Sequence, residues 1–144
     1  MPLSYLGLGS NLGDAEANVM EAIRRLEKVG TILKKSKFYL TAPWGVLDQP
    51  DFVNAVIQID TEHSPRTLLE KTQAIEKEMG RLETYKWGPR LIDIDILTYA
   101  DVTVQETDLT IPHPHMTERS FVMIPLAEID ESFKIAEKKE KEAL

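Results

Sequence analysis

Two carboxylates separated by one residue are the clearest sign of chemistry in this chain. Asp93 and Asp95 lie in the apolar run 91–97, which alternates as a β-strand does. Residues i and i+2 of a strand point to the same face, so both carboxylates project together and Ile94 is buried on the other face. Two like charges this close raise each other's pKa unless a cation lies between them.

The pair therefore predicts a magnesium site. Mg²⁺ binds carboxylate oxygens and shares its coordination shell with substrate phosphates. The alternative is an edge strand whose polar face only meets water.

Cationic side chains accompany the pair in loops or at the ends of predicted elements. They are Arg81, Lys86, Arg90, His113 and Arg119. Each alone suits a solvated surface charge, but together with Trp87 and Phe121 they describe a clamp for nucleotide phosphates. Pro112 and Pro114 flank His113 and restrict its backbone.

The glycine-rich segment 7–13 invites a phosphate-loop interpretation that its spacing does not support. It lacks the lysine of a P-loop, and its glycines do not match the dinucleotide fingerprint. We interpret it as a tight turn between a strand and a helix, capped by Asn11 or Asp14.

The elements that must position these residues follow from hydrophobic periodicity. Their order is strand 4–8, a helix through Val19, Ile23 and Leu26, strand 31–40, strand 52–60, a helix from Ser64-Pro65 to Gly80, and strand 91–97. This order predicts an α+β ferredoxin-like sandwich, a mainly antiparallel sheet with helices covering one face. A hairpin within 102–111 and a helical turn over 117–128 follow.

Composition narrows the class of protein. The chain has 144 residues, of which 42% are hydrophobic, enough for one domain with one core. A formal charge of −7 and a pI near 5.0 argue against nucleic acid as a partner. Without cysteine, neither a disulfide nor a zinc–thiolate site can form.

Membrane segments and secretory signals are not visible in the sequence. No apolar stretch approaches the roughly 20 residues that span a bilayer, and no basic region precedes a long apolar segment at the amino terminus. We expect a cytoplasmic monomer, with one domain over 1–144 that includes a charged tail from about 130 to 144.

Taken together, these segments resemble the 6-hydroxymethyl-7,8-dihydropterin pyrophosphokinases, a family of folate-pathway enzymes. The matching stretches are 7–13, 38–43, 48–55, 76–81, 87–96, 111–114 and 119–121. The segment from Trp87 to Arg90, followed by Asp93 and Asp95, is the most specific of them. The resemblance implies the same ferredoxin-like fold. It also implies transfer of pyrophosphate from ATP to 6-hydroxymethyl-7,8-dihydropterin, with AMP and the pterin diphosphate as products.

The resemblance also implies roles for single residues. Asp93 and Asp95 would bind two Mg²⁺ ions, and Arg81 and Arg90 would complete the catalytic set by neutralising phosphate charge. The ATP site would comprise Gln73, Glu76, Trp87, Arg90, Ile96, His113 and Arg119. The pterin site would comprise Thr41, Ala42, Pro43, Trp44, Phe52, Asn54 and Phe121, with the two phenylalanines on either side of the ring. Residues 81–87 would form a lid over ATP.

Three positions depart from the family pattern, and two other functions remain as alternatives. Glu83, Asp108 and Pro114 are the departures, and they concern the lid and the adenosine contacts. One alternative is a non-catalytic ferredoxin-like module that binds a small ligand. The other is a metal-dependent phosphoester hydrolase, which would need further acidic or histidine ligands near the aspartates.

Overall fold

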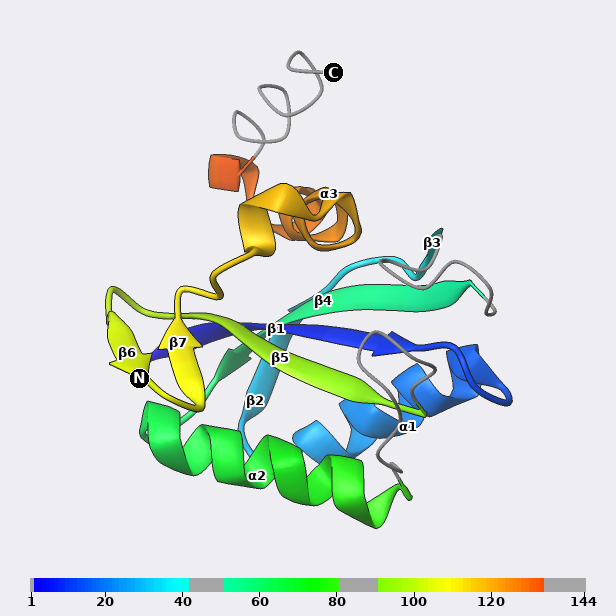
Figure 1. Cartoon of the computed structure of the whole chain (residues 1–144), viewed down its shortest axis with the longest axis horizontal. Helices are drawn as coiled ribbons and strands as arrows, with labels where there is room; N and C mark the ends of the chain where they lie inside the picture. Colours follow the sequence, from blue (N-terminus) through cyan, green and yellow to red (C-terminus); the bar gives the residue numbers. More distant parts are fainter. Residues whose placement is uncertain (1, 42–50, 81–90, 134–144) are drawn as a thin grey trace.

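The computed structural model describes residues 2–41, 51–80 and 91–133 (Figure 1). Its elements are β1 (Leu3–Ser10), α1 (Ala15–Leu26), β2 (Thr31–Lys35), β3 (Tyr39–Thr41), β4 (Phe52–Asp60), α2 (Pro65–Glu78), β5 (Asp93–Tyr99), β6 (Val104–Glu106), β7 (Leu109–Ile111), the 3₁₀ helix η1 (Met116–Glu118), α3 (Ser120–Ile129) and the 3₁₀ helix η2 (Glu131–Phe133).

The main sheet has the strand order β2-β4-β1-β5, and β3 pairs with β4. All of these pairings are antiparallel. β1 and β2 are therefore parallel to each other with β4 between them, and β4 and β5 are parallel with β1 between them. Since α1 joins the first pair and α2 the second, the chain forms two interleaved split βαβ units. The predicted ferredoxin-like α+β fold is confirmed.

The helices lie on both faces of this sheet. Figure 1 shows α1 and α2 below the sheet and α3 above it. Below, the main core includes Leu6, Leu8, Leu26, Ile57, Ile59, Leu68 and Ile94. Above, a second cluster joins Tyr5, Val56, Leu97, Met116, Val122, Met123 and Leu126. The prediction that helices cover one face is wrong for α3, because the strands carry apolar side chains on both faces and this second set also needs cover.

The carboxyl end of α3 is tied to the middle of the sheet. The Tyr5 hydroxyl donates to Oδ2 of Asp130 at 2.6 Å and accepts from Nε2 of Gln58 at 3.0 Å. Burial and the neighbouring Asp130 raise the pKa of Tyr5. The ring of Phe133 packs edge-on to Tyr5, 5.9 Å between centroids. Residues 130–133, predicted as the start of the tail, thus pack on the domain, and 134–144 lie outside the described residues.

Capping residues set the starts of the first two helices as predicted. The Asp14 carboxylate accepts from the Ala17 N–H at 3.1 Å, directly after Gly13, which has φ +61°. Ser64 accepts from the Thr67 N–H at 3.2 Å, and Pro65 is the first residue of α2. Such side-chain acceptors satisfy amide groups that have no partner inside a helix.

The segment 31–40 was predicted as one strand and forms two. β2 pairs with the second half of β4 and β3 with its first half, along the same edge. Between them the Ser36 hydroxyl accepts from the Val56 N–H at 2.9 Å. Leu40 is 72% exposed, whereas Phe38 packs against the core. The hairpin expected within 102–111 is present as β6 and β7.

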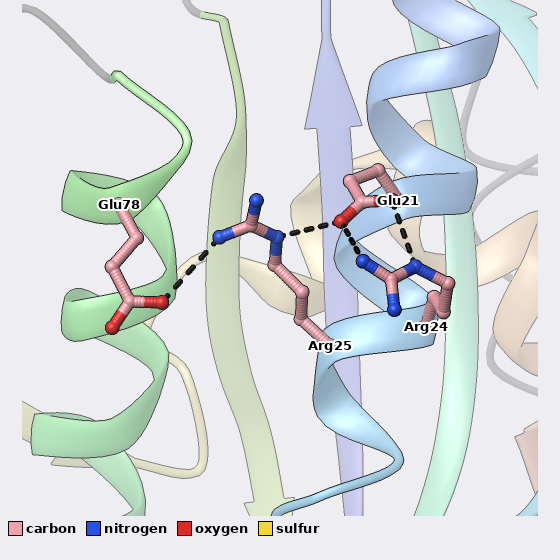
Figure 2. A network of polar contacts seen from close by, with 4 residues as sticks. All are labelled: Glu21, Arg24, Arg25 and Glu78. Atoms are coloured by element: carbon pink, nitrogen blue, oxygen red, sulfur yellow. Dashed lines mark hydrogen bonds and ion pairs between the residues drawn. The ribbon is translucent and has the colours of Figure 1, made fainter.

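A surface network joins α1 to α2 (Figure 2). Glu21 accepts from Arg24 at 2.6 Å and from Arg25 at 2.7 Å, and Arg25 also reaches Glu78 on α2 at 3.4 Å. The hydrogen bonds from the two arginines lower the pKa of Glu21 to about 2. Since all four groups are exposed or partly exposed to solvent, the network contributes little to stability. It lies on the helices that cover the face opposite α3.

Candidate active site

The two aspartates of β5 face the side of the sheet that carries α3. Alternation along the strand places Ile94 and Ile96 in the core under the opposite face. The Ile94 N–H, between the two aspartates, donates to Oε2 of Glu76 at 2.8 Å. Glu76 is only 5% exposed, so a buried carboxylate on α2 fixes the backbone that carries the pair.

Two glycines of β1 lie beside this pair. The register sets Asp93 opposite Gly9 and Asp95 opposite Gly7, and on the other side of β1 Gly9 lies opposite Asn54. A Cβ built on Gly9 would lie 2.8 Å from Oδ1 of Asn54. Real Cβ atoms do not approach this closely, so the position accepts glycine alone without a shift of Asn54. We call these two glycines the glycine floor.

The far side of the floor carries an amide and an aromatic ring. Asn54 is 7% exposed, and its Nδ2 donates to Oγ1 of Thr41 at 2.5 Å. Phe52 lies two residues earlier on the same face, within 3.6 Å of the Cβ position of Gly9. β3 and β4 thus present a hydroxyl, an amide and a ring together.

Arg119 and Phe121 lie at the amino end of α3. The guanidinium carbon of Arg119 is 5.5 Å from the centroid of the Phe121 ring. Burial lowers the pKa of Arg119, while the charges of Asp95 and Asp93 oppose this shift. An arginine remains charged under such conditions. A buried cation therefore lies within electrostatic reach of both aspartates.

His113 follows β7 and lies beside the same arginine. The backbone N–H of His113 donates to the backbone carbonyl of Leu97 at 2.9 Å. Burial, and then the charges of Arg119 and His115, lower the pKa of His113 to about 4, so the ring is neutral at pH 7. Nδ1 accepts from the His115 N–H at 3.3 Å, which places the ring proton on Nε2. Nε2 is therefore a hydrogen-bond donor.

The model of the family "7,8-dihydro-6-hydroxymethylpterin-pyrophosphokinase (HPPK)" matches residues 5–131 of this sequence. The chain belongs to this family. Its relatives are named as pyrophosphokinases, so the chain is an enzyme of this class.

Bacterial relatives match over almost the whole chain. The 2-amino-4-hydroxy-6-hydroxymethyldihydropteridine pyrophosphokinase of Methylorubrum extorquens is 44% identical over 146 residues, covering 100% of this chain and 92% of the relative. The protein of the same name from Aquifex aeolicus is 45% identical, covering 90% of this chain and 81% of the relative. The resemblance inferred from the motifs is confirmed.

Solved structures of the family share the fold. A crystal structure of Plasmodium falciparum HPPK-DHPS has a TM-score of 0.73 at 18% identity and covers 89% of this chain. Another HPPK-DHPS structure, described as a complex with substrates, has a TM-score of 0.74 at 14% identity and covers 99%. The chain spans 40% and 44% of these two longer chains. At such identities the likeness shows the fold alone.

Within this HPPK fold the residues predicted for the site fall into three groups. Asp93, Asp95, Phe52, Asn54, Thr41, Arg119, Phe121 and His113 gather around or beside the glycine floor. Gln73 is exposed on α2, whereas Glu76 and the Ile96 side chain are buried toward the other face. Arg81, Trp87, Arg90, Ala42, Pro43, Trp44 and the lid segment 81–87 lie outside the described residues.

The donor set at β5 fits magnesium. Two carboxylates on one strand leave coordination positions for water and phosphate oxygens, which Mg²⁺ prefers over a site made only of protein ligands. Within 2–41, 51–80 and 91–133, no group of three or more acidic or histidine side chains could hold a metal ion. The hydrolase alternative needed such ligands and gains no support from this part of the chain.

Sequence reasoning placed Gly7 in the first strand and Gly9 in the turn after it, and so missed the glycine floor, because β1 continues to Ser10. The available signal was the spacing: Gly7 and Gly9 alternate within a strand pattern, as glycines do where a ligand or another backbone approaches closely.

The expectation that the chain has no membrane-spanning segment can be compared with the helices among the described residues. None of the helices it describes has the length and apolarity that a bilayer crossing requires.

Proposed function

We propose that this enzyme transfers the pyrophosphoryl group of ATP to the hydroxymethyl oxygen of 6-hydroxymethyl-7,8-dihydropterin, giving AMP and the pterin diphosphate in folate biosynthesis. One observation carries the proposal. The carboxylates of β5 and the ring and amide of β4 face the same way across the glycine floor. Strands lie about 4.8 Å apart, so β5 and β4 are roughly 10 Å apart. A phosphate-binding end and a ring-binding end then lie within reach of one pair of substrates.

The ring-binding end suits a pterin. Phe52 rises from β4 and Phe121 from α3, and we propose that the flat ring binds between them. Because Nδ2 of Asn54 donates a hydrogen bond to Thr41, Oδ1 of Asn54 is oriented as an acceptor beside the glycine floor. We propose that Asn54 and Thr41, with Ala42, Pro43 and Trp44, recognise the hydrogen-bonding edge of the pterin.

The phosphate-binding end suits a triphosphate. Arg119 offers charge-assisted hydrogen bonds, and Nε2 of His113 offers a neutral one. We propose that Arg81 and Arg90 add charge neutralisation. The remaining proposed ATP contacts are Gln73, Glu76, Trp87 and Ile96. Since the Glu76 carboxylate already holds the Ile94 N–H, its proposed contribution to ATP binding is partly indirect, through the backbone of β5.

We propose that Asp93 and Asp95 hold two Mg²⁺ ions together with the phosphates of ATP. Mg²⁺ held there would supply neutralisation of the phosphate charge. The residues of the chain supply the rest. Arg119 offsets further charge, and the phenylalanines align the pterin hydroxyl. Such transfers depend on positioning and charge neutralisation, and no covalent nucleophile is required.

The deciding experiment mixes the protein with ATP, Mg²⁺ and 6-hydroxymethyl-7,8-dihydropterin and identifies the nucleotide product. We expect AMP in a one-to-one ratio with the pterin diphosphate. Steady formation of ADP, or ATP consumption that ignores the pterin, would contradict the proposal. A non-catalytic binding module would form no AMP at all.

We also propose that the protein is a cytoplasmic monomer. Light scattering on the purified protein would test the oligomeric state.

A further inference from the structure

We propose that Glu128 is a positioning residue for the pterin site, an inference that rests on the proposed function. Glu128 lies on α3, away from the floor, and contacts the segment that leads into β3. Both of its carboxylate oxygens accept from the Lys37 N–H, at 3.1 and 3.0 Å. Oε1 also accepts a hydrogen bond from the Tyr39 hydroxyl. A single carboxylate thus holds the beginning of β3 against α3.

The two elements joined by Glu128 carry opposite walls of the proposed pterin slot. On α3, Phe121 and Glu128 are seven residues apart, so they lie on the same side of the helix about two turns apart. On β3, Tyr39 and Thr41 point to the same face, and Thr41 holds the Asn54 amide. The bond to Tyr39 therefore links the wall with Phe121 to the wall with Thr41 and Asn54.

The place of Glu128 within α3 supports this role. It lies in the last turn of the helix, which ends at Ile129. A carboxylate there faces the negative end of the helix dipole and costs the helix stability. The contacts with β3 offset this cost. They also matter to β3 itself, which is three residues long and pairs with β4 along one side.

Three variants test the role in steady-state assays of AMP formation and in binding assays with 6-hydroxymethylpterin. Glu128→Ala should raise the KM for the pterin about tenfold, equivalent to about 1.4 kcal/mol. The KM for ATP should stay unchanged, and kcat at saturating pterin should fall less than threefold. Tyr39→Phe, which removes one hydroxyl, should raise the pterin KM about threefold. Glu128→Gln should fall between them, because its amide oxygen still accepts from one donor.

Glu21→Ala is the matched control, because it removes the same charge from a partly exposed helical position on α1. It should leave the pterin KM at the wild-type value. An unchanged pterin KM in Glu128→Ala would refute the positioning role. Equal losses in both KM values and kcat, with a lower melting temperature, would show a structural role only and also refute it. If Glu128→Ala does not fold, Tyr39→Phe and Glu128→Gln decide by the same criteria.

The wild-type enzyme separates this inference from the proposed function. A wild type that forms no AMP from ATP and the pterin would refute the proposed function itself. An active wild type with a normal pterin KM in all three variants would refute only the role of Glu128.

Discussion

The two faces of the sheet use the same strands for opposite purposes. Under the face covered by α1 and α2, the strands send Leu6, Leu8, Ile57, Ile94 and other apolar side chains into a closed core. On the α3 face, part of the same strands packs under the helix, and the rest presents glycine, carboxylate, amide and phenylalanine. The comparison shows that alternation along a strand lets one sheet be a stable scaffold on one side and a reactive surface on the other.

The largest effect should come from the carboxylates. Asp93→Ala or Asp95→Ala should lower kcat at least about a thousandfold, since charge neutralisation of the phosphates is a large part of catalysis. The fold should persist, because removal of one of two neighbouring carboxylates relieves their repulsion. Rates at saturating Mg²⁺ and thermal unfolding without Mg²⁺ measure the two effects. A near-normal rate in either variant would exclude the metal site.

A substitution in the core under α1 and α2 should have the opposite effect, lowering stability and leaving substrate binding unchanged. Leu6→Ala removes a fully buried side chain, 0% exposed, from the core under α1 and α2. The free energy of unfolding should fall by about 2–5 kcal/mol. The KM values should stay near wild type at a temperature where the variant is folded. Urea unfolding and kinetics on the same sample check this, and a change in pterin KM would show that the two faces are not independent.

The glycine floor lies between these extremes. Gly9→Ala should raise the pterin KM about tenfold to a hundredfold, because its Cβ would displace the Asn54 amide. Gly7→Ala is the matched variant: its Cβ would meet Leu97 at 3.5 Å, an ordinary contact. Its effect should be clearly smaller. Equal effects of the two substitutions would mean that displacement of Asn54 is not the cause.

The smallest effect concerns pH. The pKa of His113 is about 4 in the folded protein, against about 6.5 for an unperturbed histidine. Between these values the unfolded chain binds more protons, so the free energy of unfolding falls as the pH drops through this window. For a half-buried group we expect a loss of about 1 kcal/mol between pH 7 and pH 5. His113→Gln should abolish this contribution to the pH dependence of the free energy of unfolding. An NMR titration of the His113 ring with a midpoint near 6.5 would contradict the lowered pKa.

The local part of the site was predictable from the sequence. The alternation in 91–97 places both aspartates on one face, and the order of elements gives the strand order of the sheet. The caps at Asp14 and Ser64 follow from residue type at a helix start. The alternation and the two caps depend on residues that are close together in the chain, and the strand order follows from the order of elements in a split βαβ pattern.

The features of the fold and the site that the sequence did not reveal depend on contacts between residues that are distant in the chain. Glu128 and Lys37 are 91 positions apart, and no local pattern records their hydrogen bond. The position of α3 above the sheet depends on apolar side chains from three strands together. Glu76 illustrates a third reason. The resemblance associated it with ATP, but only the packing of α2 against β5 reveals that it holds the Ile94 N–H.

That hydrogen bond has a consequence beyond catalysis. β5 is the edge strand of the main sheet, and the backbone groups at an open edge can pair with a strand from another molecule. Glu76 occupies the N–H of Ile94, and the N–H of His113 occupies the carbonyl of Leu97. Two backbone groups of the strand that carries the aspartates are therefore unavailable for pairing with a strand from another molecule.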